Sequence, residues 1–234
     1  MPDGGAPAPV AVVIHGGFWR ARYGRKLMRP LCADLAGRGW IAWNVEYRRL
    51  GRGSGGGWPT TFEDVAAATD HLAEVRTDAR LDLERVVAIG HSAGGHLAAW
   101  AAARPGLPGG APGAAPRVAV TAAVAQAGVV DLRLAWELRL SDGVVGDLLG
   151  GGPDEQAERY RLASPAERVP LGVPVLLVYG GRDNVVPPSV SASFAEAARA
   201  AGDAVDVVEL ADEDHFGHVD PRNPLWEAVT RWLA

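Results

Sequence analysis

Residues 90–95 read GHSAGG and contain the side chain best suited to covalent chemistry, the hydroxyl of Ser92. Their G-x-S-x-G pattern follows an apolar, β-branched stretch and precedes a run of small, helix-forming residues. A serine in this setting lies on a strained strand-to-helix turn, and the free N–H groups of the helix start face a developing oxyanion. The pattern predicts that Ser92 attacks an acyl carbon while the Ala93 N–H donates to the oxyanion.

A serine nucleophile needs a base, and the base needs a carboxylate that orients it. Asp183 lies in the segment GGRDNVVPP after an apolar stretch, and His215 lies in DEDHFGH after the next one. The resulting chain order, serine then aspartate then histidine, differs from the order in the two common serine-protease folds. We predict that Asp183 orients His215 and that His215 takes the proton from Ser92.

Other side chains compete for these two roles. His218 is an alternative base, although His215 comes first after the strand, and Asp131 is an alternative acid after the fourth apolar stretch. A metal site of Asp214, His215 and His218 matches none of the zinc motifs of hydrolases, so we expect no metal and no other cofactor. The remaining acidic and imidazole side chains nearby are interpreted as surface or packing residues: Asp212, Asp214, His91 and His96.

The segment HGGFW, residues 15–19, supplies a second oxyanion-binding element. It directly follows the first apolar stretch, where an HGG-type loop offers backbone N–H groups to the oxyanion. Glycine is needed because the backbone must approach the substrate carbonyl closely. We expect Gly16, Gly17 or Phe18 to donate beside Ala93, and we interpret His15 as a histidine that orients the loop.

The elements between these motifs alternate between two kinds. Six apolar, β-branched stretches predict strands, and several are almost continuously apolar, as in parallel strands covered on both faces. Segments with helical spacing lie between them, which predicts right-handed crossovers and an α/β fold with a mostly parallel sheet of about six strands flanked by helices. The predicted strands are residues 9–14, 40–47, 85–89, 118–127, 173–179 and 205–210.

Length and composition agree with a single domain over residues 1–234. The net charge of −5, from 28 acidic and 23 basic side chains, provides no basic surface for nucleic acid. Cys32 is the only cysteine, the first residues do not read as a secretory signal, and no apolar run approaches the roughly 18 residues of a membrane span. We therefore expect a cytoplasmic protein without nucleic-acid or membrane partners.

Two segments interrupt the alternation. Residues 105–116 are rich in Gly, Pro and Ala and are interpreted as a loop before the fourth strand. Residues 131–170 carry short helical pieces and a GGGP turn, and we expect them to form a small lid-like insertion near the active site. Neither segment predicts a second domain.

The sequence resembles the α/β-hydrolase superfamily, in its branch of small esterases, kynurenine formamidase-like enzymes and prolyl-oligopeptidase-type domains. The resemblance covers nearly the whole chain and implies six parallel strands in the order 2-1-3-4-5-6. Two strands that precede the HGG strand in larger relatives are not expected here. The matching features are residues 15–19, Glu46-Tyr47-Arg48, Trp58-Pro59, residues 90–95, Ser164-Pro165, Asp183 with Pro187-Pro188, and His215-Phe216.

This strand order has two consequences. Strands 1 and 3 become neighbours at the point where ligands bind in open α/β sheets, so the HGG loop meets Ser92. The strand at residues 40–47 becomes an exposed edge, which proteins usually cover or pair. We expect a second subunit, as in a homodimer, or the N-terminal arm to shield it.

Together the motifs and the resemblance imply a serine hydrolase that cleaves carboxylic esters of small acyl groups through a Ser-His-Asp triad and an acyl-enzyme. Its substrate is expected to be a small-molecule ester or amide. An arylformamidase acting on N-formylkynurenine is the alternative. A peptidase and a non-catalytic ligand-binding protein on the same scaffold are further alternatives.

Aromatic and basic side chains near the motifs are candidates for substrate contacts. The candidate pocket residues are Trp19, Trp58, His91 and Phe216, with Trp136 as a further aromatic side chain. Five basic side chains follow the oxyanion loop, and they either recognise an anionic substrate or form a solvated helix face, which we favour. They are Arg20, Arg22, Arg25, Lys26 and Arg29.

Overall fold

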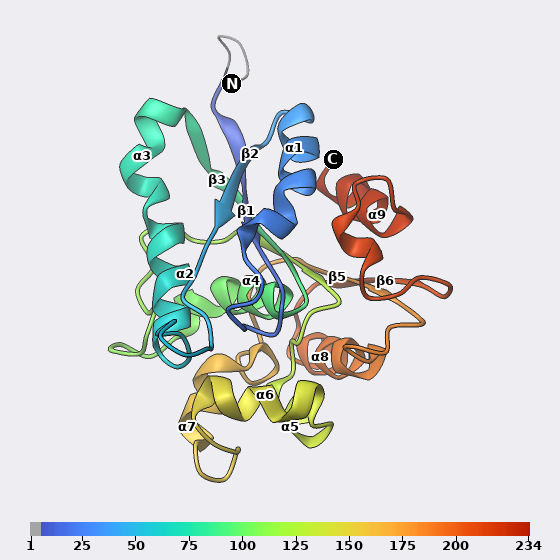
Figure 1. Ribbon diagram of the computed structural model, residues 1–234. Coiled ribbons are helices and arrows are strands. Elements are labelled where there is room, and N and C mark those ends of the chain that lie inside the picture. Colours follow the sequence, from blue (N-terminus) through green and yellow to red (C-terminus); the bar gives the residue numbers. More distant parts are fainter. Residues whose placement is uncertain (1–5) are drawn as a thin grey trace.

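The computed structural model describes residues 6–234 and contains six strands: β1 (Ala8–Ile14), β2 (Ile41–Val45), β3 (Leu81–His91), β4 (Ala122–Gln126), β5 (Val175–Gly180) and β6 (Val205–Leu210). They form one sheet in the order β2-β1-β3-β4-β5-β6, and every pair of neighbours is parallel (Figure 1). The predicted order and direction are confirmed. Because β1 and β3 are neighbours, the segments that follow them meet at the carboxyl edge of the sheet.

The central strands are buried on both faces, which explains their nearly continuous apolar sequence. In β1 the five residues from Val10 to Ile14 have no exposed surface. The two edge strands are only partly buried, since β2 is half-buried over residues 41–44 and β6 exposes Asp206 and Glu209.

Helices cover both faces of the sheet: α1 (Arg29–Gly37) and α9 (Pro224–Leu233) on one, and α2 (Thr60–Asp70), α3 (Leu72–Ala79), α4 (Ala93–Ala103) and α8 (Pro188–Ala200) on the other (Figure 1). Leu35 and Trp226 are buried in the core on the first face, and Phe62, Trp100 and Phe194 are buried in the core on the second. The result is a three-layer α/β sandwich, as in the predicted fold class.

β4 begins at Ala122, later than the predicted start at residue 118, because the backbone before it is bound elsewhere. The N–H groups of Arg117 and Val118 both donate to the carboxylate of Asp70, at 3.0 and 3.2 Å. The buried guanidinium of Arg104 pairs with the same carboxylate at 2.6 Å. Asp70 therefore anchors both ends of the loop that connects α4 to β4.

Beyond the carboxyl edge of the sheet lie the short helices α5 (Leu132–Glu137), α6 (Leu140–Leu149) and α7 (Ala157–Ala163) (Figure 1). The backbone is left-handed at Arg139, just before α6, and at Ser141, Asp142 and Gly143 in the first turn of α6, with φ between 45° and 82°. The guanidinium of Arg20, in the loop after β1, donates to the carbonyl oxygen of Ser141 at 2.8 Å. This bond ties the 131–170 segment to the loop after β1, while its action as a lid stays a prediction.

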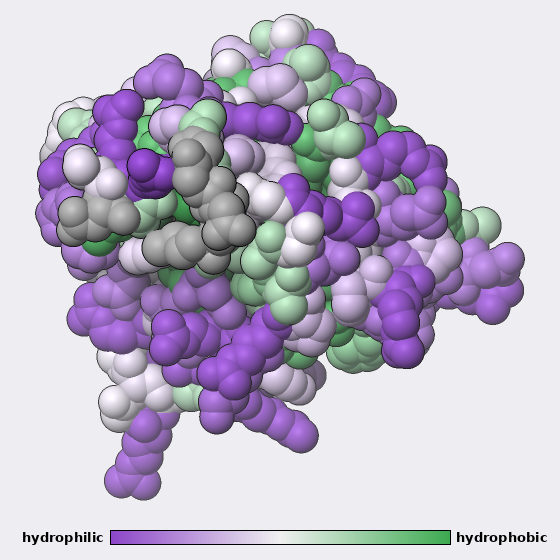
Figure 2. Space-filling model, turned by 90° about the horizontal axis from the view of Figure 1, so that it is seen from above, coloured by the Kyte–Doolittle hydropathy of each residue, from purple (hydrophilic) through white to green (hydrophobic). Residues whose placement is uncertain are grey.

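Three surface features concern the expected partners. Among the described residues β2 pairs with β1 alone, so the homodimer across this edge stays a prediction, and the N-terminal arm at residues 1–5 lies outside the described residues. Seen from the amino-terminal side of the strands, the surface is mainly hydrophilic, with apolar side chains scattered over it (Figure 2). None of the helices in residues 6–234 combines the length and the apolar character needed to cross a bilayer.

Candidate active site

Ser92 lies between the last residue of β3 and the first residue of α4, on the turn predicted from its sequence. Its backbone has φ 57° and ψ −120°, a strained conformation for a residue with a side chain. The glycines on either side are required by space, since a Cβ on Gly94 would lie 2.1 Å from the carbonyl oxygen of Ile14. A Cβ on Gly90 would lie 2.0 Å from the carbonyl oxygen of Gly94. The tight turn therefore holds the start of α4 against β1 and keeps Ser92 at the carboxyl edge of the sheet.

Asp183 and His215 meet across the loops that follow β5 and β6. His215 Nδ1 donates to Asp183 Oδ2 at 2.7 Å, and both side chains are buried. The other carboxylate oxygen of Asp183 accepts the N–H groups of Val185 and Val186 at 2.9 and 2.8 Å. The carboxylate is thus held by three hydrogen bonds. A proton on Nδ1 leaves Nε2 of His215 free to act as a base.

His215 lies beside the turn that carries Ser92. The centroid of its ring is 4.6 Å from that of His91, the residue that immediately precedes Ser92. No hydrogen bond joins Ser92 Oγ to His215 Nε2 within residues 6–234. Such bonds are often long in unliganded hydrolases and shorten in the substrate complex.

The loop after β1 reaches the same place. A Cβ on Gly16 would lie 3.0 Å from Ser92 Cβ and 2.6 Å from the carbonyl oxygen of His91, so the loop touches the Ser92 turn directly. In the described part of the chain the N–H groups of Gly17 and Phe18 donate to no other group. Ala93 is the first residue of α4, and its N–H has no acceptor inside the helix. Three backbone donors are therefore available near Ser92.

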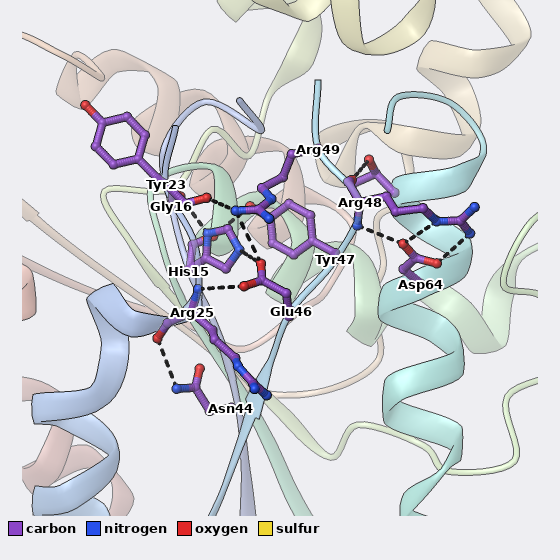
Figure 3. A network of polar contacts seen from close by, with 11 residues as sticks. His15, Gly16, Tyr23, Arg25, Asn44, Glu46, Tyr47, Arg48, Arg49 and Asp64 are labelled. Carbon is purple, nitrogen blue, oxygen red and sulfur yellow. Dashed lines mark hydrogen bonds and ion pairs between the residues drawn. The ribbon is translucent and has the colours of Figure 1, made fainter. Parts of the chain in front are cut away.

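The buried side chain of His15 packs against this loop and contacts the Gly16 carbonyl oxygen (Figure 3). His15 Nδ1 lies 2.8 Å from the carbonyl oxygen of Gly16, and His15 Nε2 lies 2.8 Å from Glu46 Oε1. The Tyr47 ring stacks on the His15 ring at 4.3 Å, and its hydroxyl donates to the His15 carbonyl oxygen at 2.9 Å. Because C=O and N–H point in opposite directions in a trans peptide, holding the Gly16 oxygen turns the Gly17 N–H away from His15. This agrees with the expected loop-orienting role of His15.

The protonation of His15 decides how many of these bonds form at once. A carbonyl and a carboxylate both accept, so only the imidazolium can donate to Gly16 and Glu46 together. Burial lowers the pKa of His15, and the Gly16 carbonyl and the Glu46 carboxylate oppose that shift in part. The neutral ring keeps one of the two hydrogen bonds.

The alternative base and acid are placed unfavourably for catalysis. His218 has no exposed surface, and burial, reinforced by the neighbouring His91 and His215, lowers its pKa well below the usual value. One carboxylate oxygen of Asp131 caps α5 by accepting the Leu134 N–H at 3.0 Å, and the other accepts the Ser193 hydroxyl at 2.6 Å. Both oxygens of Asp131 are therefore engaged outside the site.

The four candidate pocket residues lie in different environments. Trp19 is completely buried and packs edge-on against His96, so it belongs to the core and has no surface for a substrate. Trp58 lines a cavity of about 630 Å³ between residues 108–112 and α7, and none of the three predicted triad residues lines that cavity. Phe216 is 66% exposed and packs edge-on against the His215 ring, and His91 is buried beneath that ring.

The basic side chains after the oxyanion loop are divided in the structure. Arg20 bonds to Ser141, as described above, while the other four are exposed: Arg22, Arg25, Lys26 and Arg29. Exposure agrees with the solvated face that the sequence favours for these four residues.

Two contributions to the site are not predicted from the sequence. Glu46 belongs to a matching motif without a predicted role, and in the structure it is the partner of His15. Gln126, at the end of β4, also has no predicted role, yet its buried amide donates to the carbonyl oxygen of His218 at 3.1 Å. A signal existed for Gln126, since a glutamine that ends an apolar strand must find a partner when buried.

Comparison with known families gives one match over most of the chain. The model of the BD-FAE family matches residues 1–198. Two esterases of Mycobacterium tuberculosis are similar in sequence: LipQ is 31% identical over 90% of this chain and 51% of its own, and LipC is 30% identical over 89% of this chain and 53% of its own. The chain therefore spans about half the length of these relatives.

Solved structures show the same fold. A truncated carbohydrate esterase from gut microbiota superposes with a TM-score of 0.82 at 22% identity, over 99% of this chain and 86% of that one. The carboxylesterase Cest-2923 of Lactobacillus plantarum has a TM-score of 0.79 at 21% identity, over 99% and 87%. The butyrate-bound esterase Est2 of Thermogutta terrifontis has a TM-score of 0.77 at 24% identity, over 99% and 86%.

Proposed function

The chain belongs to the BD-FAE family, and from this membership and the arrangement around Ser92 we propose that it is a serine hydrolase of small carboxylic esters. The observation that carries the proposal is the 2.7 Å contact between His215 Nδ1 and Asp183 Oδ2, formed beside the Ser92 turn. Such a contact sets the tautomer that leaves Nε2 unprotonated for the nucleophile. The sequence relatives are named as esterases, which supports the same chemistry.

The reaction is a double displacement. His215 Nε2 takes the proton of Ser92 Oγ as the oxygen bonds to the acyl carbon, and the carbonyl becomes an oxyanion. Collapse of this intermediate breaks the bond to the alcohol oxygen, which leaves with the proton from His215. Water then attacks the acyl-enzyme with His215 as base, and the acid leaves as Ser92 regains its proton.

The oxyanion is held by backbone N–H groups of Ala93, Gly17 and Phe18. The free N–H groups of the loop and its contact with Ser92 support this assignment. Each such donor contributes roughly 3–4 kcal/mol to stabilising the transition state. Asp183 stabilises the imidazolium that forms on His215 and keeps its ring oriented.

Esters of short acyl groups are the proposed substrates. The structural neighbour Est2 was solved with butyrate and also with propionate, which supports a site for short acyl chains. Phe216 is the aromatic side chain both exposed and in contact with the His215 ring, and it provides an apolar surface for the substrate.

The test compares p-nitrophenyl acetate, butyrate and octanoate with N-formylkynurenine, using wild type, Ser92→Ala and Ser191→Ala. Ser191 is a buried serine in α8 and serves as the matched control. We expect fastest turnover of the short esters, a loss of about 10⁴-fold or more in Ser92→Ala, and little change in Ser191→Ala. Faster turnover of N-formylkynurenine than of the esters would show that the protein is a formamidase and not an esterase. Unchanged hydrolysis by Ser92→Ala would refute the mechanism.

A further inference from the structure

The turn that carries His215 is held by two buried side chains at the ends of neighbouring strands. His91, the last residue of β3, places Nε2 2.9 Å from the carbonyl oxygen of His215. Gln126, the last residue of β4, donates its amide to the carbonyl oxygen of His218 at 3.1 Å. His91 and Gln126 are direct partners in the register of β3 and β4. The 215–218 turn therefore rests on two adjacent strand ends.

The same two residues are attached to the nucleophile. His91 precedes Ser92 in the chain, and the backbone carbonyl of Gln126 accepts the Ser92 N–H at 2.8 Å. Each residue thus joins the backbone of the nucleophile to a carbonyl of the turn that carries the base. The distance between Ser92 and His215 depends on both connections.

The directions of these hydrogen bonds follow from chemistry. A carbonyl oxygen only accepts, so His91 must carry its proton on Nε2. Burial lowers the pKa of His91 to about 3, and the neighbouring His215 adds to the shift. His91 therefore stays neutral when His215 takes up a proton, and the donor is kept through the reaction.

Packing alone does not account for the polar character of these side chains. His91 is 3% exposed and Gln126 has no exposed surface. In residues 6–234, His91 Nδ1 and Gln126 Oε1 have no hydrogen-bond partner, so the bond to the turn is the one side-chain hydrogen bond that each makes. Burying an unpaired polar atom carries a free-energy cost that an apolar side chain of similar size avoids.

We propose that His91 and Gln126 are positioning residues, whose two hydrogen bonds set the place of the His215 turn relative to Ser92. Neither residue takes part in the chemical step. This proposal rests on the proposed function, because it assigns the two residues to the same hydrolytic site. It predicts that removing either donor lowers kcat, while restoring a donor of similar reach restores it.

The variants are His91→Leu, His91→Gln, Gln126→Leu and the double variant, with His96→Leu as the matched control. His96 is also a buried imidazole close to Ser92 in the chain, and its Nε2 donates to a carbonyl oxygen at 2.9 Å, but that carbonyl belongs to Ala163. Its loss removes a similar bond without touching the His215 turn. Thermal unfolding of each variant measures the loss of stability separately from activity.

On p-nitrophenyl butyrate we expect kcat to fall about 10- to 100-fold in His91→Leu and in Gln126→Leu, with KM changed less than about threefold. His91→Gln should recover most of the loss, and His96→Leu should stay within about threefold of wild type. The double variant should lose less than the product of the single effects, since both act on one turn. A kcat in the two Leu variants no lower than in His96→Leu overturns the proposal.

A second measurement tests the positioning role of His91 and Gln126 without relying on activity. The proton shared by His215 Nδ1 and Asp183 gives a low-field proton NMR signal, which is assigned by its loss in His215→Gln. We expect the signal to broaden or disappear in His91→Leu and Gln126→Leu and to persist in His96→Leu. Persistence in the first two variants overturns the positioning role. If wild type shows no Ser92-dependent hydrolysis, the proposed function is refuted. The NMR signal of the His215–Asp183 proton then still tests whether His91 and Gln126 position the His215 turn.

Discussion

Glu46 Oε1 and His15 Nε2 lie 2.8 Å apart, so the oxyanion loop has a carboxylate–imidazole pair of its own behind it. The first pair contacts the Gly16 carbonyl oxygen, whereas Asp183 and His215 form the pair beside the Ser92 turn, where we propose that it serves the nucleophile. Each histidine is oriented by a carboxylate from another part of the chain. The two pairs lie on either side of the Ser92 turn in the sheet order, since His15 follows β1 and Asp183 follows β5.

Glu46→Ala tests the pair behind the oxyanion loop. The substitution removes both the charge that favours protonated His15 and the partner of Nε2, so the ring is held less firmly against the Gly16 carbonyl. We expect kcat to fall about tenfold, less than the loss of a whole oxyanion donor, with little change in KM. Asp64→Ala is the control, because Asp64 pairs with Arg48 at 2.7 Å away from this loop. An equal effect of both substitutions would contradict the role of Glu46.

Asp183→Asn tests the orienting carboxylate. The amide oxygen can still accept the N–H groups of Val185 and Val186, but its NH₂ group favours the wrong tautomer of His215. We expect kcat to fall by about 10⁴-fold with the fold intact, measured by ester hydrolysis and circular dichroism.

Asp131→Asn tests the alternative acid and is compared with Asp183→Asn. Asp131 caps α5, so its loss should cost about 1 kcal/mol of unfolding free energy or less and leave kcat nearly unchanged. A loss of activity comparable with that of Asp183→Asn would show that Asp131 is the catalytic acid.

The buried imidazoles predict how stability depends on pH. Burial lowers the pKa of His91 to about 3 and of His96 to about 4, and it lowers the pKa of His218 as well. In the unfolded chain these groups take up protons below about pH 6.5, while the folded chain keeps them neutral. Stability is therefore fully present above about pH 6.5 and is lost as the pH falls toward 4.

Urea unfolding at pH 7, 6 and 5 measures this dependence. Below pH 6.5 each buried imidazole should contribute a slope of about 1.4 kcal/mol per pH unit. His96→Gln removes one of these imidazoles and should reduce the slope of unfolding free energy against pH by the contribution of one group. An unchanged slope in that variant would show that His96 is not held neutral in the folded chain.

Gly94→Ala tests the space behind the nucleophile. Alanine is normally favoured in helices, but here its Cβ would lie 2.1 Å from the Ile14 carbonyl oxygen, so β1 and α4 must separate. We expect a loss of about 3 kcal/mol of unfolding free energy and a loss of activity. Gly37→Ala, in α1, is the control, since a Cβ there meets nothing within 4 Å and should be neutral or stabilising.

Much of the architecture is predictable because its signals are local. Continuous apolar stretches indicate buried parallel strands, and the alternation with helical segments indicates crossovers. The nucleophile turn is local too, since Gly90, Ser92 and Gly94 act within a few residues and need no distant partner to be recognised. The strand order, by contrast, came from the family resemblance, and the sheet confirms it.

Burial and partner choice were decided by tertiary contacts. Trp19 follows the HGG motif by position, yet packing places it in the core against His96. Asp131 and Asp183 both follow apolar strands. The carboxylate of Asp131 accepts hydrogen bonds from Leu134 and Ser193, whereas that of Asp183 accepts one from His215. The spacing of residues in a chain does not predict which buried donor pairs with which acceptor. That choice arises only when strands from distant segments meet, because each buried polar atom must then pair with whatever lies within reach.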